Sequence, residues 1–111
     1  MEYALLAYGL VEGTPGPMDA AIGAILDKPY VTGWARLFGD ESATTLRTAD
    51  ERTLLTDGPF IDSKEYLIGL IMIEADNLDA AVAIARELQD ARAAGGVMEL
   101  RPVFEAQFRG T

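Results

Sequence analysis

The sequence predicts an α+β domain of ferredoxin-like type, in which a four-stranded antiparallel sheet carries two helices on one face and an additional β-hairpin. Residues 66–75 are almost unbroken apolar, and their length and β-branched content are typical of a central strand. The other patterns indicate the order strand, helix, strand, strand, helix, strand, which right-handed crossovers fold into such a sheet. Threonine-rich segments between the second and third strands predict the hairpin.

Length and composition indicate one folded domain. The chain has 111 residues, of which 50% are hydrophobic and 24% charged, so it can bury a core and has no room for a second domain. We expect residues 1–105 to form the domain and residues 106–111 a C-terminal tail. No apolar run approaches the roughly 20 residues that span a bilayer, and the first residues lack the basic start of a signal peptide. A cytoplasmic protein without membrane contact is the expectation.

Two missing residue types and the net charge exclude several functions. The chain contains neither cysteine nor histidine, which rules out disulfides, thiolate chemistry, typical zinc sites and histidine-based triads. No cofactor is identifiable from the sequence. The formal net charge of -9 repels phosphate backbones, so nucleic acid is not an expected partner.

The first half of the chain predicts a strand, a short helix and a second strand. Residues 2–8 are apolar on both faces of a strand, and a loop rich in glycine and proline follows at residues 9–17. Apolar residues at helical spacing predict a helix over residues 18–27, which the Lys28-Pro29 pair ends. Residues 30–38 read as the second strand, with a bulge expected at Gly33.

The middle of the chain predicts a hairpin and a turn. Residues 44–48 and 53–56 are threonine-rich and lie on either side of residues 49–52, as two strands of a hairpin would, so we expect a hairpin that extends the sheet at its edge. The sequence Asp57-Gly58-Pro59 predicts a change of chain direction, because each of these residue types favours turns.

The second half predicts the longer helix and the last strand. Asp76 or Asn77 can cap the helix, and Asp79 places negative charge in its first turn. An apolar stripe at i, i+3, i+4 and i+7 then begins at Leu78. Two consecutive glycines, Gly95 and Gly96, stop the helical region, and residues 97–104 are expected to be the last strand.

The apolar content of the sheet predicts an assembly of two chains. With both helices on one face the other face of the sheet meets water, yet the two expected central strands are apolar on both faces. Such a patch is unusual in a monomer, so we expect a homodimer with two-fold symmetry that packs sheet against sheet. The alternative is that the hairpin folds back over this face.

The motif Asp57-Gly58-Pro59-Phe60, followed by Lys64-Glu65 and later by Glu99-Leu100-Arg101-Pro102, resembles the YCII-related proteins, specifically their DGPF branch. The resemblance covers roughly residues 2–104 and implies a ferredoxin-like fold in dimeric α+β barrels. Related proteins are suspected of enzymatic activity through a histidine and aspartate pair, which this chain cannot form. The chain also has Asp62 where the pattern usually has glutamate, and Ile68 where it usually has glycine.

The turn at Asp57 is the candidate functional site. Loops at strand ends can bring carboxylates and cations together, so Asp57 or Glu65 is a possible general acid or base. Lys64 or Arg101 would hold an anionic group of a small-molecule ligand. The other candidate ligand-binding residues are Gly58, Pro59, Phe60 and Glu99. The alternative is structural, since turn preference alone explains residues 57–60.

Several further residues leave two interpretations open. Glu99 and Arg101 share one strand face and form either an ion pair at a dimer or pocket contact, or a solvated surface. Glu74 lies inside the apolar central strand, where an unpaired charge is costly, so it needs a partner or a water-facing strand end. No metal site is expected, because the spacing of acidic residues lacks the alternation of a calcium loop. The function is therefore a small-molecule-binding protein or carboxylate enzyme, or alternatively a non-enzymatic interaction or regulatory module.

Overall fold

The computed structural model of the chain describes residues 1–92 and 95–108. Its elements in chain order are β1 Glu2–Gly9, α1 Ala20–Leu26, β2 Val31–Arg36, the 3-10 turn η1 Asp40–Ser42, β3 Thr44–Ala49, β4 Arg52–Asp57, β5 Tyr66–Glu74, α2 Leu78–Ala91 and β6 Val97–Pro102.

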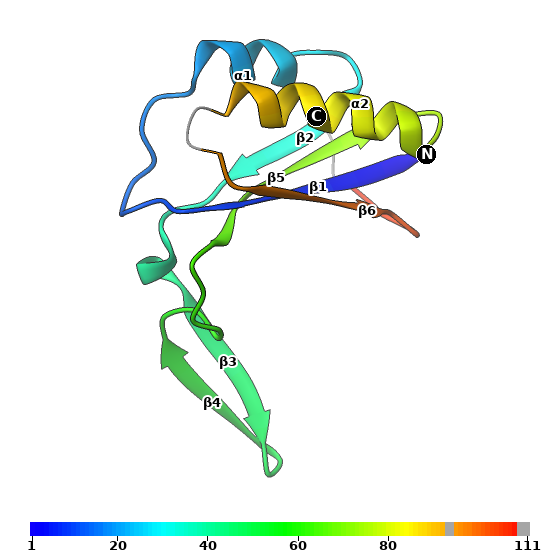
Figure 1. The fold of residues 1–111 in the computed structure, drawn as a ribbon. Coiled ribbons are helices and arrows are strands. Elements are labelled where there is room, and N and C mark those ends of the chain that lie inside the picture. The colour runs from blue at the N-terminus through cyan, green and yellow to red at the C-terminus, as the bar shows by residue number, and fades with distance from the viewer. Residues whose placement is uncertain (93–94, 109–111) are drawn as a thin grey trace.

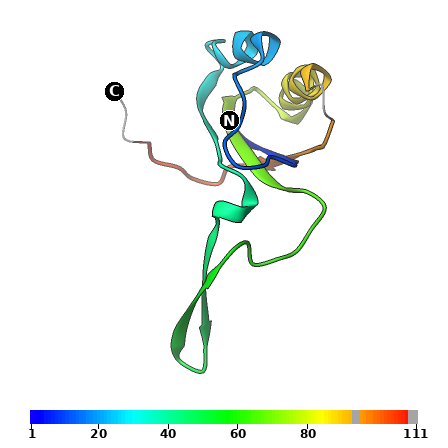
Figure 2. The ribbon, with the colours of Figure 1, turned by 90° about the vertical axis from the view of Figure 1, so that its left-hand side faces the viewer.

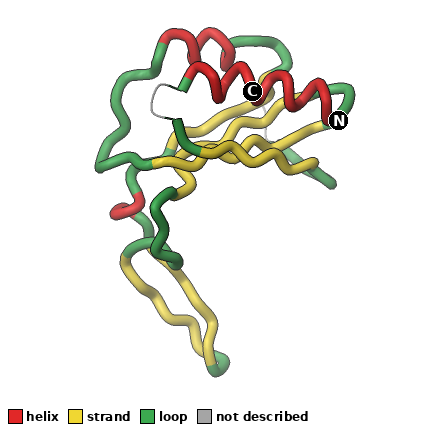
Figure 3. Tube along the Cα trace, in the orientation of Figure 1, coloured by secondary structure: helices red, strands yellow, loops and turns green. Residues whose placement is uncertain are grey.

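The main sheet has four antiparallel strands in the order β2-β5-β1-β6, and both helices cover one of its faces (Figures 1 and 3). This order is consistent with a ferredoxin-like fold and confirms the predicted α+β class. Strand β5 pairs with both β1 and β2, so the prediction that the long apolar segment is a central strand is also confirmed.

The core lies between the sheet and the two helices. Alternate residues of β1 point into it, and Tyr3 and Leu5 are 3% and 0% exposed. Helix α2 begins at Asn77, whose side chain accepts a hydrogen bond from the amide of Ala80 at 2.9 Å. The buried hydrophobic cluster consists of Tyr3, Leu5, Leu26, Ile73, Ala75, Ala81, Ala85 and Leu88.

Helix α1 is shorter than the sequence predicts. It spans residues 20–26 instead of 18–27, because Asp19 is its cap and accepts hydrogen bonds from the amides of Ala21 and Ile22. The predicted bulge at Gly33 is confirmed by a shift of the β2–β5 register between Val31 and Gly33.

Two strands end earlier than predicted. Strand β2 covers residues 31–36 instead of 30–38, because the chain turns after Leu37 toward η1, where the amides of Ser42 and Ala43 donate to the carbonyl oxygens of Gly39 and Asp40. Strand β6 covers residues 97–102 instead of 97–104; beyond it the amide of Val103 still donates to the carbonyl oxygen of Glu2 at 3.0 Å.

The hairpin is present, but its predicted place at the sheet edge is wrong. Strands β3 and β4 pair only with each other, in a separate two-stranded sheet. The hairpin projects from the body on the side opposite the helices (Figures 1 and 2). The radius of gyration of 15.6 Å therefore exceeds the value of about 13 Å expected for a compact domain of this length. The expectation fails because residues 37–43 lead the chain away from the edge strand β2.

The sheet face opposite the helices is left uncovered within the described residues. It carries apolar, partly buried side chains of the two central strands, namely Ala4, Leu6, Leu70 and Met72. We call these four residues the open face. The alternative that the hairpin folds back over this face is wrong, because the hairpin points away from it (Figure 2). Central strand β5 is thus well buried on its helix-facing side only.

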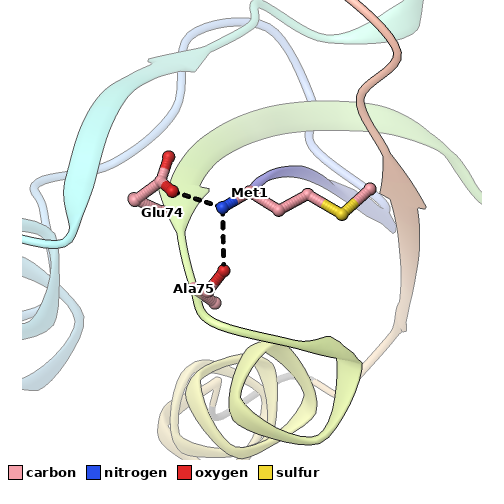
Figure 4. A network of polar contacts seen from close by, with 3 residues as sticks. All are labelled: Met1, Glu74 and Ala75. Atoms are coloured by element: carbon pink, nitrogen blue, oxygen red, sulfur yellow. Dashed lines mark hydrogen bonds and ion pairs between the residues drawn. The ribbon is translucent and has the colours of Figure 1, made fainter.

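Glu74 has both a partner and a water-facing position, the two alternatives that the sequence analysis left open for this charge. Its side chain is 54% exposed and forms an ion pair with the amino group of Met1, which also donates to the carbonyl oxygen of Ala75 at 3.1 Å (Figure 4). Among residues 1–92 and 95–108, no helix is both long enough and apolar enough to cross a membrane.

Candidate functional site

A groove of about 850 Å³ lies where the hairpin joins the body. It is bordered by the end of β2, by η1, by the start of β3 and by the loop that leads from β4 to β5. Its walls carry four aromatic side chains and three charged ones, which are Tyr8, Phe38, Phe60, Tyr66, Arg36, Asp40 and Glu65. Both its volume and its mixture of apolar walls with a few charges are typical of ligand sites.

The loop after β4 is tied to the hairpin by its own backbone. Gly58 adopts a φ of +98°, donates to the carbonyl oxygen of Ala43 at 2.6 Å and accepts from the Thr45 hydroxyl at 2.7 Å. A residue with a Cβ rarely adopts this φ, which explains why glycine occupies the turn. Further along, the Ser63 amide donates to the Tyr66 hydroxyl at 3.1 Å and the Glu65 amide donates to the Ser63 hydroxyl at 3.2 Å. These contacts position Glu65 at the groove.

Only part of the predicted site comes together here. Pro59, Phe60 and Glu65 line the groove. Asp57 is exposed at the end of β4, where it pairs with Thr44, and neither it nor Lys64 contributes to the groove lining. The catalytic role of Asp57 and the binding role of Lys64 stay predictions.

Glu99 and Arg101 lie in another part of the molecule. They face the same side of β6 and pair in register with Leu6 and Ala4, so they border the open face and do not line the groove. The expectation that they share one strand face is confirmed. Their predicted role in a pocket with the Asp57 turn has no support in this arrangement.

A second cavity, of about 230 Å³, lies between the sheet and the two helices. We call it the inner cavity. Small residues leave the space for it, since Ala7 and Gly69 are directly paired on the helix-facing side of the central strands. Its other walls are mainly apolar, and its polar or aromatic members are Trp34, Arg36, Arg92 and Asp19.

Arg92 is the most constrained charged side chain of the inner cavity. Its Nη2 donates to the carbonyl oxygen of Tyr8 at 2.7 Å, and its Nη1 donates to Gln89 Oε1 at 3.0 Å and to the carbonyl oxygen of Val97 at 3.2 Å. Burial lowers the pKa of this guanidinium, and the negative charge of Glu65 opposes that change. No carboxylate of the described residues lies within ion-pair distance of it.

Sequence reasoning missed both arginines of the inner cavity. Arg36 is the last residue of β2, and Arg92 directly follows the amphipathic helix α2, where a cation is ordinarily interpreted as a solvated side chain at the helix end. The available signal was the pair of small residues, Ala7 and Gly69, inside otherwise bulky strands. Trp34 also lines this cavity, while 48% exposed.

The remaining titratable groups suggest no further site. Burial raises the pKa of Tyr30, and the nearby Glu87 carboxylate raises it further through its charge and a hydrogen bond. Within the described ranges, no group of three or more acidic side chains is arranged to hold a metal ion.

Comparison with known proteins identifies two similarities. The family model of the YCII-related domain matches residues 1–107. An uncharacterized protein of Rhizobium meliloti (strain 1021) is 41% identical over 69 residues, which correspond to 62% of this chain and 56% of that relative. The chain therefore matches little more than half the length of this relative.

Proposed function

Because the chain belongs to the family of YCII-related domains, we propose that it is a homodimeric small-molecule-binding protein whose ligand occupies the groove beside the hairpin. The single observation that carries this proposal is the groove itself. A volume of about 850 Å³ is sufficient for a metabolite-sized ligand, and Phe60 and Glu65 of the motif that predicted the site both line it.

The groove favours Glu65 over Asp57 as an acid or base. A general base must reach the proton that it removes, and Glu65 lines the space in which a ligand would lie. Asp57 would act only on a ligand that extends out of the groove toward β4. The aromatic side chains of Phe38, Phe60 and Tyr66 would bind the apolar part of the ligand.

Native mass spectrometry of the purified chain tests the ligand site. A homodimer of two 12.0 kDa chains is expected at 24.0 kDa, with a reproducible additional mass from the co-purified ligand. Phe60→Ala should remove this mass because it deletes an apolar wall of the groove, and Glu65→Gln should weaken its retention about tenfold or more by removing a charge-assisted contact.

Asp57→Asn is the matched control, since Asp57 lies outside the groove and its loss should leave the additional mass in place. Retention of the mass by both Phe60→Ala and Glu65→Gln would show that the ligand binds elsewhere. If only Asp57→Asn loses the additional mass, the ligand binds at the Asp57 turn and not in the groove.

The open face supports the homodimer. Four apolar side chains of the central strands lie partly exposed there, beside the acidic Glu99 and the basic Arg101. A two-fold axis through this face can bring Glu99 of one protomer opposite Arg101 of its partner, twice. The hairpin projects from the body on the side of the open face (Figures 1 and 2). This packing would form the dimeric α+β barrel that the family resemblance implies.

A charge exchange tests this contact. Glu99→Arg should weaken the dimer about tenfold or more, because it places like charges opposite each other twice in one interface. The double variant Glu99→Arg and Arg101→Glu should restore much of the lost affinity, because the opposite charges again face one another. Analytical ultracentrifugation across a concentration series measures both.

Asp90→Arg is the control for net charge, because Asp90 lies exposed on α2, away from the open face. A wild-type chain that stays monomeric at high micromolar concentration would contradict the dimer. A Glu99→Arg defect that the second exchange leaves unchanged would contradict the proposed pairing.

A second candidate function rests on the hairpin. Leu46, Leu54 and Leu55 are 66%, 47% and 67% exposed, which is unusual for three leucines in one projecting arm. We propose as the alternative a non-enzymatic interaction or regulatory module that uses this arm. A dimer that purifies without any bound small molecule would favour it. Membership of the DGPF branch and a cytoplasmic location stay predictions from the sequence.

A further inference from the structure

The inner cavity is separate from the groove beside the hairpin. It lies on the helix-facing side of the sheet, among Ala7, Gly69, Ile22 and Leu88, whereas the groove lies beside the hairpin. Arg36 contributes to the lining of both, and the proposed dimer contact leaves the helix-facing side of the sheet free. An inference about the inner cavity therefore stands independently of the proposed function.

The structure makes room specifically for the Arg92 guanidinium. A Cβ at Gly9 would lie 3.0 Å from Arg92 Nη2, and a Cβ at Gly96 would lie 2.5 Å from it and 3.0 Å from Cζ. Both glycines thus leave space for this side chain at the ends of β1 and β6, next to Ile68 Cδ1 at Gly9 and to the carbonyl oxygen of Tyr8 at Gly96. Three carbonyl-type acceptors then hold the guanidinium in place, from Tyr8, Gln89 and Val97.

The fixed guanidinium retains unused binding capacity. A guanidinium has five N–H groups, and the described contacts of Arg92 use three of them, leaving Nε and one proton of Nη2. All three acceptors are neutral, so the positive charge is not neutralised by any contact. A partly buried cation whose hydrogen-bond partners are all neutral favours binding of an anion, because the interaction is stronger where water is excluded, and Glu65 acts on this guanidinium only through its charge.

The rest of the lining increases this preference for an anion. Arg36 adds a second guanidinium, of which one N–H is used, by the carbonyl oxygen of Gly16 at 2.8 Å. Asp19 is the acidic residue of the lining, and its Oδ1 is occupied by two amides of α1. In a chain of net charge -9, two arginines at one apolar cavity are a local exception to the overall charge.

We propose that the inner cavity is a binding site for a small apolar carboxylate, whose carboxylate is held by Arg92 and Arg36 and whose hydrocarbon part lies against Trp34, Ile22 and Leu88. The volume sets the size of this ligand. An apolar cavity of about 150 Å³ accommodates benzene, so 230 Å³ accommodates one ring or a short branched chain with a carboxylate-bearing arm.

Phenylacetate is the probe for this site, and phenylacetamide is its neutral counterpart of nearly equal shape. Trp34 is the only tryptophan of the chain, so its fluorescence reports on ligand at the cavity wall. We expect phenylacetate to cause a saturable change with at least about tenfold higher affinity than phenylacetamide, because only the carboxylate forms charge-assisted hydrogen bonds.

Two kinds of variant locate the binding. Arg92→Gln should reduce the affinity for phenylacetate about tenfold or more and bring it close to that for phenylacetamide. Ala7→Leu should block both probes, because its added carbon atoms fill the cavity without touching the arginines. Arg86→Gln is the matched control, since this arginine of α2 does not line the inner cavity. Phe60→Ala should also leave phenylacetate binding unchanged, which separates this site from the groove.

Arg92 also anchors the ends of β1 and β6, so Arg92→Gln must first be shown to retain the wild-type circular dichroism spectrum. If it does not, Arg36→Gln replaces it, because among the described residues the Arg36 side chain donates its hydrogen bond to the carbonyl oxygen of Gly16 and not to those strands, and a loss of carboxylate preference is expected there too. Equal affinities for the two probes, no saturable response from the folded wild-type chain, or a response that survives Ala7→Leu would each overturn the proposal.

Discussion

Ile73→Ala should lower the free energy of unfolding by about 2–5 kcal/mol, the usual cost of removing most of a fully buried isoleucine. Ile73 is 0% exposed in β5 and pairs with Tyr3 of β1 and Val31 of β2, so three strands close around it. The neighbouring residues belong to strands that pair with β5 on both sides, so they have little freedom to move into the space that the side chain leaves. Urea unfolding followed by circular dichroism measures the change.

Ile61→Ala is the control for this substitution, because Ile61 is 56% exposed in the loop after β4. We expect it to change stability by less than about 0.5 kcal/mol. All three proteins need the same chain concentration, since dimer formation would itself raise the apparent stability. A loss below about 1 kcal/mol for Ile73→Ala would mean that the core is packed more loosely than the structure shows.

Gly96→Ala should cost about 2–4 kcal/mol and displace Arg92, since it combines backbone strain with a steric clash. Gly96 has a φ of +104°, and its added Cβ would collide with the carbonyl oxygen of Tyr8 and with the Arg92 guanidinium. The carbonyl oxygen cannot move far, because it belongs to the paired strand β1 and accepts the Arg92 hydrogen bond. Thermal unfolding measures the stability. The phenylacetate titration measures the affinity of the inner cavity, which should fall if Arg92 is displaced.

Alanine variants of two other glycines distinguish the cost of backbone strain from the cost of the steric clash at Gly96. Gly58 has a similar φ of +98° and Gly95 has a φ of +73°, and neither would bring a Cβ within 4 Å of another residue. Their alanine variants should therefore cost only about 1–2 kcal/mol each, the strain of a left-handed conformation. If all three variants lost the same stability, the close approach at Gly96 would contribute nothing.

Local patterns predicted most of the elements correctly. Apolar periodicity located the central strand and the longer helix, because a buried face imposes the period of its own secondary structure on the sequence. The boundaries differed by one or two residues, as at Asp19, whose capping hydrogen bonds decide where α1 begins. The hairpin was predicted as a hairpin but in the wrong place, since strand pairing within it is local and its direction from the body is not.

The candidate site was predicted less completely, for a related reason. The motif at residues 57–60 correctly indicated a turn, and Phe60 and Glu65 line a groove that the turn helps to form. Glu99 and Arg101 were correctly placed on one strand face, although that face borders the other side of the sheet. A strand pattern determines which residues share a face, but it does not determine which loops lie near that face.

By itself, the sequence determined the fold class, the order of the elements, the apolar character of both sheet faces and the absence of histidine and cysteine chemistry. These properties depend on periodicity and composition, which need no knowledge of distant contacts. Only the tertiary structure decided that Arg92, Tyr8 and Gly96 meet beside a cavity. They meet because β1, α2 and β6 pack together, and a contact between residues 84 positions apart follows from that packing and leaves no local signal in the chain.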